Sequence, residues 1–259
     1  MLNVLQITDV HLLAGTHERL LGVDTTDSLR AVLRQALSER TPDALLATGD
    51  IAHNGEPETY DRFSAIVEEY YTGPRLVLPG NHDLWAPMSR YLRQPCVLSL
   101  PGWDLIGLDS HADGSPAAQL GEPDMLALRE ACAAAGDNHV LLATHHPPLM
   151  VDCPWLDKDR IQNADELLEW LSEHTRVVAM VFGHAHQIIE SDYKYAGRRI
   201  ALLGTPSTCF QFAPRSEKFA IDDTKPGYRW LYLASDGGVT SEVRRVADYP
   251  LNIELPQRH

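Results

Sequence analysis

The side chains of this chain that could do chemistry come in short polar groups that follow apolar runs. The most specific group is Gly80-Asn81-His82-Asp83, which comes directly after the β-prone run of residues 75–79. Asn81 can offer a carbonyl oxygen to a hard cation, and the His82 imidazole beside it can donate a proton. Asp83 could fix the orientation of that imidazole. Because Asn, Asp and Gly also form ordinary turns, this motif alone would not define a site.

Four further apolar runs end in the same kinds of side chain. Asp9 and His11 follow residues 2–7, Asp50 follows residues 44–48, His145 follows residues 140–143, and His184 with His186 follow residues 177–182. Ligands of open α/β sheets gather where the carboxyl ends of the strands meet. We therefore expect these polar groups to lie together in the folded chain.

The seven candidate ligands are two carboxylates, one amide and four imidazoles, with no thiolate among them. Such a set suits Mn, Fe, Co or Zn. It is larger than one ion needs, because a catalytic site keeps positions open for water and substrate, so we expect two ions. We assign Asp9, His11 and His186 to the first ion, Asn81, His145 and His184 to the second, and Asp50 to a bridge between them.

This ligand set predicts phosphoester hydrolysis. Two divalent ions carry +4 and the two carboxylates −2, which leaves about +2 to attract a phosphate. The ions would lie roughly 3.5–4 Å apart and turn a bridging water into hydroxide for in-line attack on phosphorus. His82, bound to neither ion, would stabilise the developing charge or protonate the leaving oxygen, and Asp83 would orient it.

The elements that must position these groups alternate between strand and helix as far as residue 182. Apolar positions at helical spacing predict helices between the strands, the first capped by Thr25 or Thr26 and a later one by Asn163. Beyond residue 186 the chain is rich in β-prone runs, with strands expected at residues 188–195, 199–203, 218–221, 228–233 and 239–246. No repeat or linker divides the chain, so we expect one domain over residues 1–259.

Composition limits the partners. The formal charge of −14, from 22 basic and 36 acidic side chains, opposes binding to a long nucleic acid. The chain start lacks the basic segment of a signal peptide, and no apolar stretch approaches the roughly 18 residues of a membrane span. The four cysteines are scattered without a Cys-x-x-Cys motif. We therefore expect a cytoplasmic protein with a small-molecule substrate and no membrane or nucleic-acid partner.

Taken together, the motifs resemble the calcineurin-like metallophosphoesterases. The matching pattern is Asp9-x-His11, Gly49-Asp50, Gly80-Asn81-His82-Asp83, His145-x-Pro147 and Gly183-His184-x-His186. The resemblance implies the ligand roles assigned above and selects His145 over His146. It also implies an α/β fold in which a two-layered β-sandwich is flanked by helices. Many members carry an acidic residue three positions after the bridging aspartate, where this chain has His53.

A narrower resemblance extends over nearly the whole chain. Residues 20–25, 153–157 and 205–212 are similar to the bacterial class III cyclic AMP phosphodiesterases. This resemblance implies hydrolysis of 3′,5′-cyclic AMP to 5′-AMP with two divalent ions, Fe and/or Mn, with Zn or Co as alternatives. The competing functions are a broad-specificity phosphodiesterase or phosphomonoesterase, and a metal-free interaction protein with the same fold.

Several other side chains could contact the substrate. His146, Arg160 and Asn163 are the candidates near the ligand motifs and the loop that follows residue 153. Phe210 and Phe212 could stack on a nucleobase, although aromatic residues at alternating strand positions more often pack in a core. The sequence does not indicate an oligomeric state.

Overall fold

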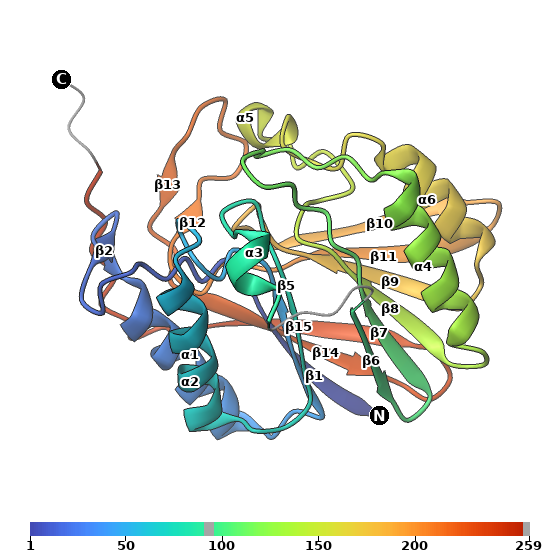
Figure 1. Ribbon diagram of the computed structural model, residues 1–259, viewed down its shortest axis with the longest axis horizontal. Helices are drawn as coiled ribbons and strands as arrows, with labels where there is room; N and C mark the ends of the chain where they lie inside the picture. The colour runs from blue at the N-terminus through green and yellow to red at the C-terminus, as the bar shows by residue number, and fades with distance from the viewer. Residues whose placement is uncertain (91–95, 256–259) are drawn as a thin grey trace.

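Two β-sheets face each other in the computed structural model, which describes residues 1–90 and 96–255 (Figure 1). The first sheet has the strand order β15-β14-β1-β4-β5. These strands are β1 (Leu2–Ile7), β4 (Ala44–Thr48), β5 (Arg75–Leu78), β14 (Gly227–Leu233) and β15 (Val239–Arg245). Within this sheet β1, β4 and β5 are mutually parallel, so their carboxyl ends lie at one edge.

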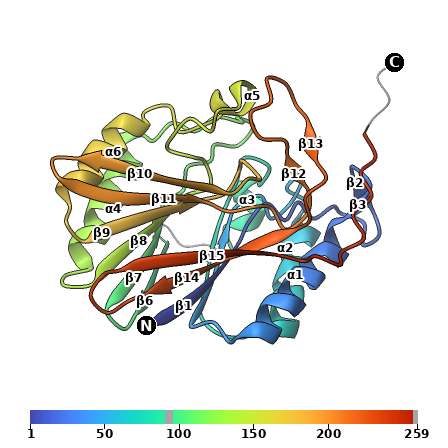
Figure 2. The ribbon, with the colours of Figure 1, turned by 180° about the vertical axis from the view of Figure 1, so that it is seen from behind.

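The second sheet has the order β10-β11-β9-β8-β7-β6 and lies against the first, as the view from behind shows (Figure 2). Its strands are β6 (Cys96–Leu100), β7 (Trp103–Gly107), β8 (His139–Ala143), β9 (Val177–Phe182), β10 (Ile189–Tyr195) and β11 (Arg198–Gly204). The strands β7, β8 and β9 are parallel neighbours. Parallel strands covered on both faces need apolar side chains on both faces, which explains the unbroken apolar runs of β4, β8 and β9.

Helices cover the outer face of each sheet (Figure 1). The helices α1 (Thr25–Glu39) and α2 (Pro57–Tyr70) pack on the first sheet, and α4 (Glu122–Ala134) and α6 (Ala164–Glu173) pack on the second. A third apolar cluster, which includes Leu46, Leu141 and Val181, fills the space between the sheets. The predicted β-sandwich flanked by helices is therefore confirmed.

The remaining elements are short. They are the helices α3 (Trp85–Met88) and α5 (Pro154–Asp157) and the two-stranded ribbons β2 (Arg19–Leu20) with β3 (Val23–Asp24) and β12 (Gln211–Phe212) with β13 (Ile221–Asp222). The strand expected at 218–221 is present only as β13, because it pairs with just two residues of β12. Among the described residues, none of the helices combines the length and the hydropathy that a membrane crossing requires.

Two predicted helix caps differ from the structure. Asp24 caps α1 by accepting a hydrogen bond from the main-chain N–H of Asp27 at 3.0 Å, and Thr25 and Thr26 already lie inside the helix. Asn163 stands at the start of α6, but its side chain makes no capping hydrogen bond. Its amide group is instead paired with the main chain of another loop, as described below.

Candidate metal centre

The seven predicted ligands converge at the edge where the parallel strands of both sheets end. Asp9 and His11 follow β1, Asp50 follows β4 and Asn81 follows β5, all in the first sheet, while His145 follows β8 and His184 and His186 follow β9 in the second. The sandwich thus joins groups that lie up to 177 positions apart in the chain, from Asp9 to His186. Both sheets contribute because the parallel strands of each sheet have their carboxyl ends at this edge.

One half of the cluster contains Asp9, His11 and His186. The Nε2 atoms of His11 and His186 are 3.1 Å apart, and His186 Nε2 lies 3.3 Å from Asp9 Oδ1. Asp50 Oδ2 lies 3.5 Å from His11 Nε2. All four side chains are buried, so their mutual placement is set by packing.

The other half contains Asn81, His145 and His184. Asn81 Oδ1 lies 2.9 Å from His184 Nδ1 and 3.1 Å from His145 Nε2. Asp50 Oδ1 lies 3.5 Å from His145 Nε2, while its other carboxylate oxygen faces the first half. The Asp50 carboxylate therefore stands between the two halves, which is the position of a bridging ligand.

The orientation of the His186 imidazole shows that the first half fits a cation. Its Nδ1 lies 2.8 Å from the carbonyl oxygen of Phe210. Because a carbonyl oxygen only accepts, Nδ1 carries the proton and Nε2 presents a lone pair. That lone pair faces the carboxylate of Asp9 and the Nε2 of His11. The Asp9 carboxylate and the His186 lone pair repel one another unless a proton or a metal cation lies between them, so the pair can hold a cation.

The second half fits a cation for the same reason. His145 Nδ1 lies 2.8 Å from the carbonyl oxygen of Thr48, so in the neutral ring the Nε2 lone pair faces Asp50 Oδ1. Burial lowers the pKa of His184 to about 3. Burial also lowers the pKa of His11 well below its usual range. Imidazoles held neutral in this way offer the lone pair that a metal ion binds.

The main chain is strained at five of the seven ligands. The φ angle is 53° at Asp9, 50° at His11, 51° at Asp50, 63° at His184 and 49° at His186. For residues other than glycine this left-handed region costs about 1–3 kcal/mol each. The strain is held by contacts such as the hydrogen bond from the His184 N–H to the Asp9 carboxylate at 3.1 Å. Strained residues concentrated at one point are typical of a functional site.

Two glycines let the strand ends approach one another. A Cβ atom at Gly80 would meet the Asp50 carboxylate, and a Cβ atom at Gly183 would meet the side chains of Thr8 and Asp9. Each of these glycines precedes a ligand on one strand and touches a ligand from another. The glycines in the Gly-Asn-His-Asp and Gly-His-x-His motifs are therefore required by the close packing of the ligands.

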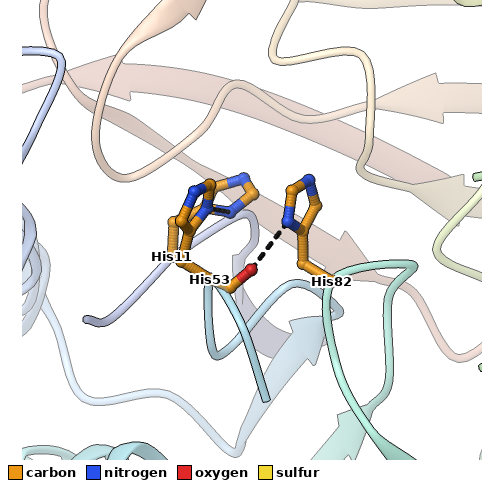
Figure 3. Close-up of side chains that lie close together, drawn as sticks. All are labelled: His11, His53 and His82. Carbon is orange, nitrogen blue, oxygen red and sulfur yellow. Dashed lines mark hydrogen bonds between the residues drawn. The ribbon is translucent and has the colours of Figure 1, made fainter. Parts of the chain in front are cut away.

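His82 lies at the mouth of the cluster, but Asp83 does not orient it as predicted. His82 Nδ1 lies 2.8 Å from the main-chain carbonyl oxygen of His53 (Figure 3). The Asp83 carboxylate instead accepts hydrogen bonds from the main-chain N–H groups of Ile51, Ala52 and Gly80, at 2.8–3.1 Å. Burial raises the pKa of Asp83 to about 6. Asp83 thus ties together the loops that carry Asp50 and Asn81, which is a positioning role.

His53 is a part of the site that the ligand motifs did not reveal. Its Nδ1 lies 3.4 Å from Nδ1 of His11, and its ring stacks on His82 with centroids 4.8 Å apart (Figure 3). When Nε2 of His11 binds a metal, its Nδ1 carries a proton, and the facing His53 nitrogen can accept it in a hydrogen bond. The departure from the family pattern at this position pointed to His53.

A cavity of about 170 Å³ opens over the cluster. Besides ligands and His82, its lining includes Pro116, Trp155, Leu156, Asp159 and Phe212. A larger cavity of about 560 Å³ lies beside the start of α1, and its lining contains none of the seven ligands. The smaller cavity is the one relevant to the chemistry, because only its lining combines metal-binding groups with space for a substrate.

The three predicted substrate contacts have partners within the protein. His146 is buried, with Nδ1 2.9 Å from the Ser110 hydroxyl and Nε2 3.2 Å from the carbonyl oxygen of Pro116. Arg160 donates to the carbonyl oxygen of Ile161 at 3.0 Å. In the part of the chain that the structure describes, neither residue lines the cavity over the cluster.

Asn163 is also outside that lining. Its Oδ1 accepts from the Leu120 N–H at 3.0 Å and its Nδ2 donates to the Leu120 carbonyl at 2.9 Å. This pair of hydrogen bonds fastens the start of α6 to the segment that precedes α4. The structure therefore provides a complete structural explanation for Asn163.

A helix-flanked β-sandwich whose strand ends hold a ligand set for two ions is the architecture of a metallophosphoesterase. The family model of the calcineurin-like phosphoesterases matches residues 2–188, and the chain belongs to this family of metal-dependent hydrolases, as its motifs predicted. Members of the family use a dinuclear metal centre, and the His and Asp groups described above can bind metal.

Relatives named as cyclic AMP phosphodiesterases are similar along nearly the whole chain. The chain is 39% identical over 252 residues to the 3′,5′-cyclic adenosine monophosphate phosphodiesterase CpdA of Escherichia coli (strain K12), covering 95% of this chain and 90% of the relative. It is 34% identical over 258 residues to the enzyme of the same name from Pseudomonas aeruginosa, covering 97% of this chain and 92% of the relative.

Solved structures share the fold at low sequence identity. A dimetal phosphatase from Danio rerio aligns with a TM-score of 0.63 at 15% identity, covering 95% of this chain and 96% of that one. A purple acid phosphatase from yellow lupin aligns with a TM-score of 0.67 at 12% identity, covering 97% of this chain and 52% of that one. At these identities the likeness concerns the fold alone.

Proposed function

We propose that this protein hydrolyses 3′,5′-cyclic AMP to 5′-AMP with two divalent ions, Fe and/or Mn. The observation that carries the proposal is the placement of Asp50, whose two carboxylate oxygens each face one half of a ligand set (Asp9, His11, His186 and Asn81, His145, His184). The relatives that match nearly the whole chain are named for this substrate, which supports cyclic AMP over other phosphoesters.

Bound divalent ions would supply a water of lowered pKa and a positive site for the phosphoryl oxygens. The side chains and main chain of the protein then fix the relative positions of the ligands. Asp50 sets the spacing of the two halves, and Asp83 locks the loops that carry Asp50 and Asn81. The strained left-handed turns keep the ligand side chains aimed at a common point.

We infer that His82 assists the leaving oxygen. Attack on phosphorus breaks the bond from phosphorus to O3′ of the ribose, and O3′ must then take up a proton. With Nδ1 of His82 donating to the carbonyl oxygen of His53, the imidazolium form holds its second proton at Nε2. This proton is the one available to O3′, and the neutral ring that remains keeps its hydrogen bond to the main chain.

The proposal is tested by assaying the apo protein, reconstituted with Mn and then with Fe, against a panel of phosphoesters. The panel contains cyclic AMP, a generic aryl phosphodiester and a phosphomonoester. We expect the highest kcat/KM for cyclic AMP. Higher kcat/KM for the generic diester would refute the cyclic nucleotide assignment and favour a broad-specificity phosphoesterase. Protein that binds no metal and turns over nothing would favour an interaction protein.

We also infer that residues 1–259 form one metallophosphoesterase domain located in the cytoplasm. The core between the sheets combines segments from both ends of the chain, including Val4 and Leu231. Cys132, Cys153 and Cys209 are free thiols, which suits a reducing compartment.

A further inference from the structure

A row of aromatic rings leads from a metal ligand to the surface. The ring of Phe212 stacks on His186, with centroids 4.2 Å apart and an interplanar angle of 25°. Trp155 meets Phe212 edge to face at 4.9 Å, and Phe219 meets Trp155 at 5.5 Å and Phe212 at 5.7 Å. We call Phe212, Trp155 and Phe219 the aromatic wall.

The aromatic wall is built by segments that only the fold brings together. Trp155 lies on α5, Phe212 lies on β12, and Phe219 lies between β12 and β13. In both views of the ribbon α5 stands beside the β12 and β13 segment at the rim of the molecule (Figures 1 and 2). Phe219 is 47% exposed and Trp155 is partly exposed, while Phe212 also packs against the apolar cluster that contains Phe210 and Tyr249.

Trp155 carries an unused hydrogen-bond donor. Its Nε1 is buried and has no hydrogen-bond partner within residues 1–90 and 96–255. A buried donor left without a partner is costly, and buried indole N–H groups usually find one. Trp155 and Phe212 also line the cavity over the metal ligands. Trp155 thus contributes an aromatic ring to the lining of the cavity beside the metal ligands.

We propose that the aromatic wall binds the planar base of the substrate and that Trp155 determines specificity for it. This inference rests on the proposed function. A phosphate held at His186 and its neighbouring ligands places the rest of the substrate beside Phe212, because that ring stacks on His186. The faces of aromatic side chains bind nucleobases of any sequence by stacking, so a wall of three rings suits a purine.

The test compares cyclic AMP with a base-free ribose 3′,5′-cyclic phosphate, using enzyme reconstituted with Mn. In the wild type we expect kcat/KM for cyclic AMP to exceed that for the base-free probe by on the order of 10-fold or more. Trp155→Ala should remove this preference by raising KM for cyclic AMP, and should leave kcat for the base-free probe unchanged. Trp155→Phe, which keeps an aromatic ring, should retain most of the preference.

The matched control is Trp170→Ala. Trp170 lies on α6, stacks on His174 and is partly buried like Trp155, but it does not line the cavity. The Trp170→Ala substitution should leave the preference for cyclic AMP over the base-free probe unchanged. A Trp155→Ala enzyme with the full wild-type preference, or one equally impaired with both probes, would overturn the role of the wall. A wild type without any preference for cyclic AMP over the base-free probe would also overturn the role of the wall. The proposed function is tested separately, by the comparison of cyclic AMP with the aryl phosphodiester.

Discussion

The Nε2 atoms of His11 and His186 lie 3.1 Å apart, although the two residues follow strands of different sheets. At least one of these nitrogens presents a lone pair, because His186 holds its proton at Nδ1. When His11 carries its proton at Nε2, it donates a hydrogen bond to His186; when it carries the proton at Nδ1, both Nε2 atoms can offer a lone pair to a cation. Packing of both sheets holds the two nitrogens at this distance.

Metal removal should destabilise the fold. An ion that binds only the folded state adds about 2.7 kcal/mol to the free energy of unfolding when present at about 100 times its Kd. We expect the unfolding temperature to fall when a chelator is added and to rise as Mn is titrated back, as measured by calorimetry. Identical unfolding temperatures with chelator and with Mn, Fe, Zn or Co would contradict a metal centre at this position.

Asp50→Ala should abolish both metal binding and turnover. Asp50 has one carboxylate oxygen 3.5 Å from His11 Nε2 and the other 3.5 Å from His145 Nε2, so its loss should remove a ligand from each ion. Asp9→Ala removes a ligand from one half only and should retain metal at the other. Elemental analysis after dialysis distinguishes these outcomes. An Asp50→Ala protein that remains loaded and active would show that the bridging assignment is wrong.

His82→Ala should separate metal binding from catalysis. Its imidazole is fixed by the carbonyl oxygen of His53 and is assigned to neither ion. We expect wild-type metal content and a loss in kcat of on the order of 10² to 10⁴. Steady-state kinetics together with elemental analysis check this. Loss of metal on substitution would instead make His82 a ligand.

His53→Ala should weaken one of the two metal sites. It removes the nitrogen that lies 3.4 Å from Nδ1 of the ligand His11, and loss of such a supporting partner typically lowers metal affinity by about 10- to 100-fold. His53→Gln, which offers an acceptor oxygen, should restore part of the affinity. Competition with a chromophoric chelator measures both. The control His174→Ala alters a histidine bonded to the Trp170 carbonyl, and it should bind metal normally.

His111 should make stability depend on pH. Burial alone lowers its pKa, but the carboxylates of Asp109 at 2.9 Å and Asp113 at 3.0 Å outweigh burial and raise the pKa to about 9. Since this folded-state pKa lies above the unfolded value of about 6.5, the protonated ring stabilises the fold fully below about pH 6.5. That contribution, on the order of 1 kcal/mol after allowance for solvent screening, is lost as pH rises through about 9.

Urea unfolding at a series of pH values measures this effect. The free energy of unfolding should decline between about pH 6.5 and pH 9 in the wild type, and the decline should be smaller in His111→Gln. An equal decline in both proteins would assign the pH dependence to other groups.

The sequence by itself determined which side chains are candidate ligands and which strands carry them. Apolar runs that end in Asp50, Asn81 or His184 predict buried strands with polar ends, because side-chain burial and ligand chemistry are local properties of residue type. The same local patterns placed most helices, and the motif spacing indicated the family and hence the sandwich. The resemblance to the family's His-x-Pro motif, through Pro147, favoured His145 over His146 as a ligand.

Only the tertiary structure decided how these groups pair. It turned Asp83 toward main-chain N–H groups and not toward His82, and it brought the His53 carbonyl to the imidazole of His82. It also assembled Trp155 and Phe212 into a wall beside the ligands. Such contacts join segments tens of residues apart, and their geometry depends on how two sheets pack face to face, which no short stretch of sequence encodes.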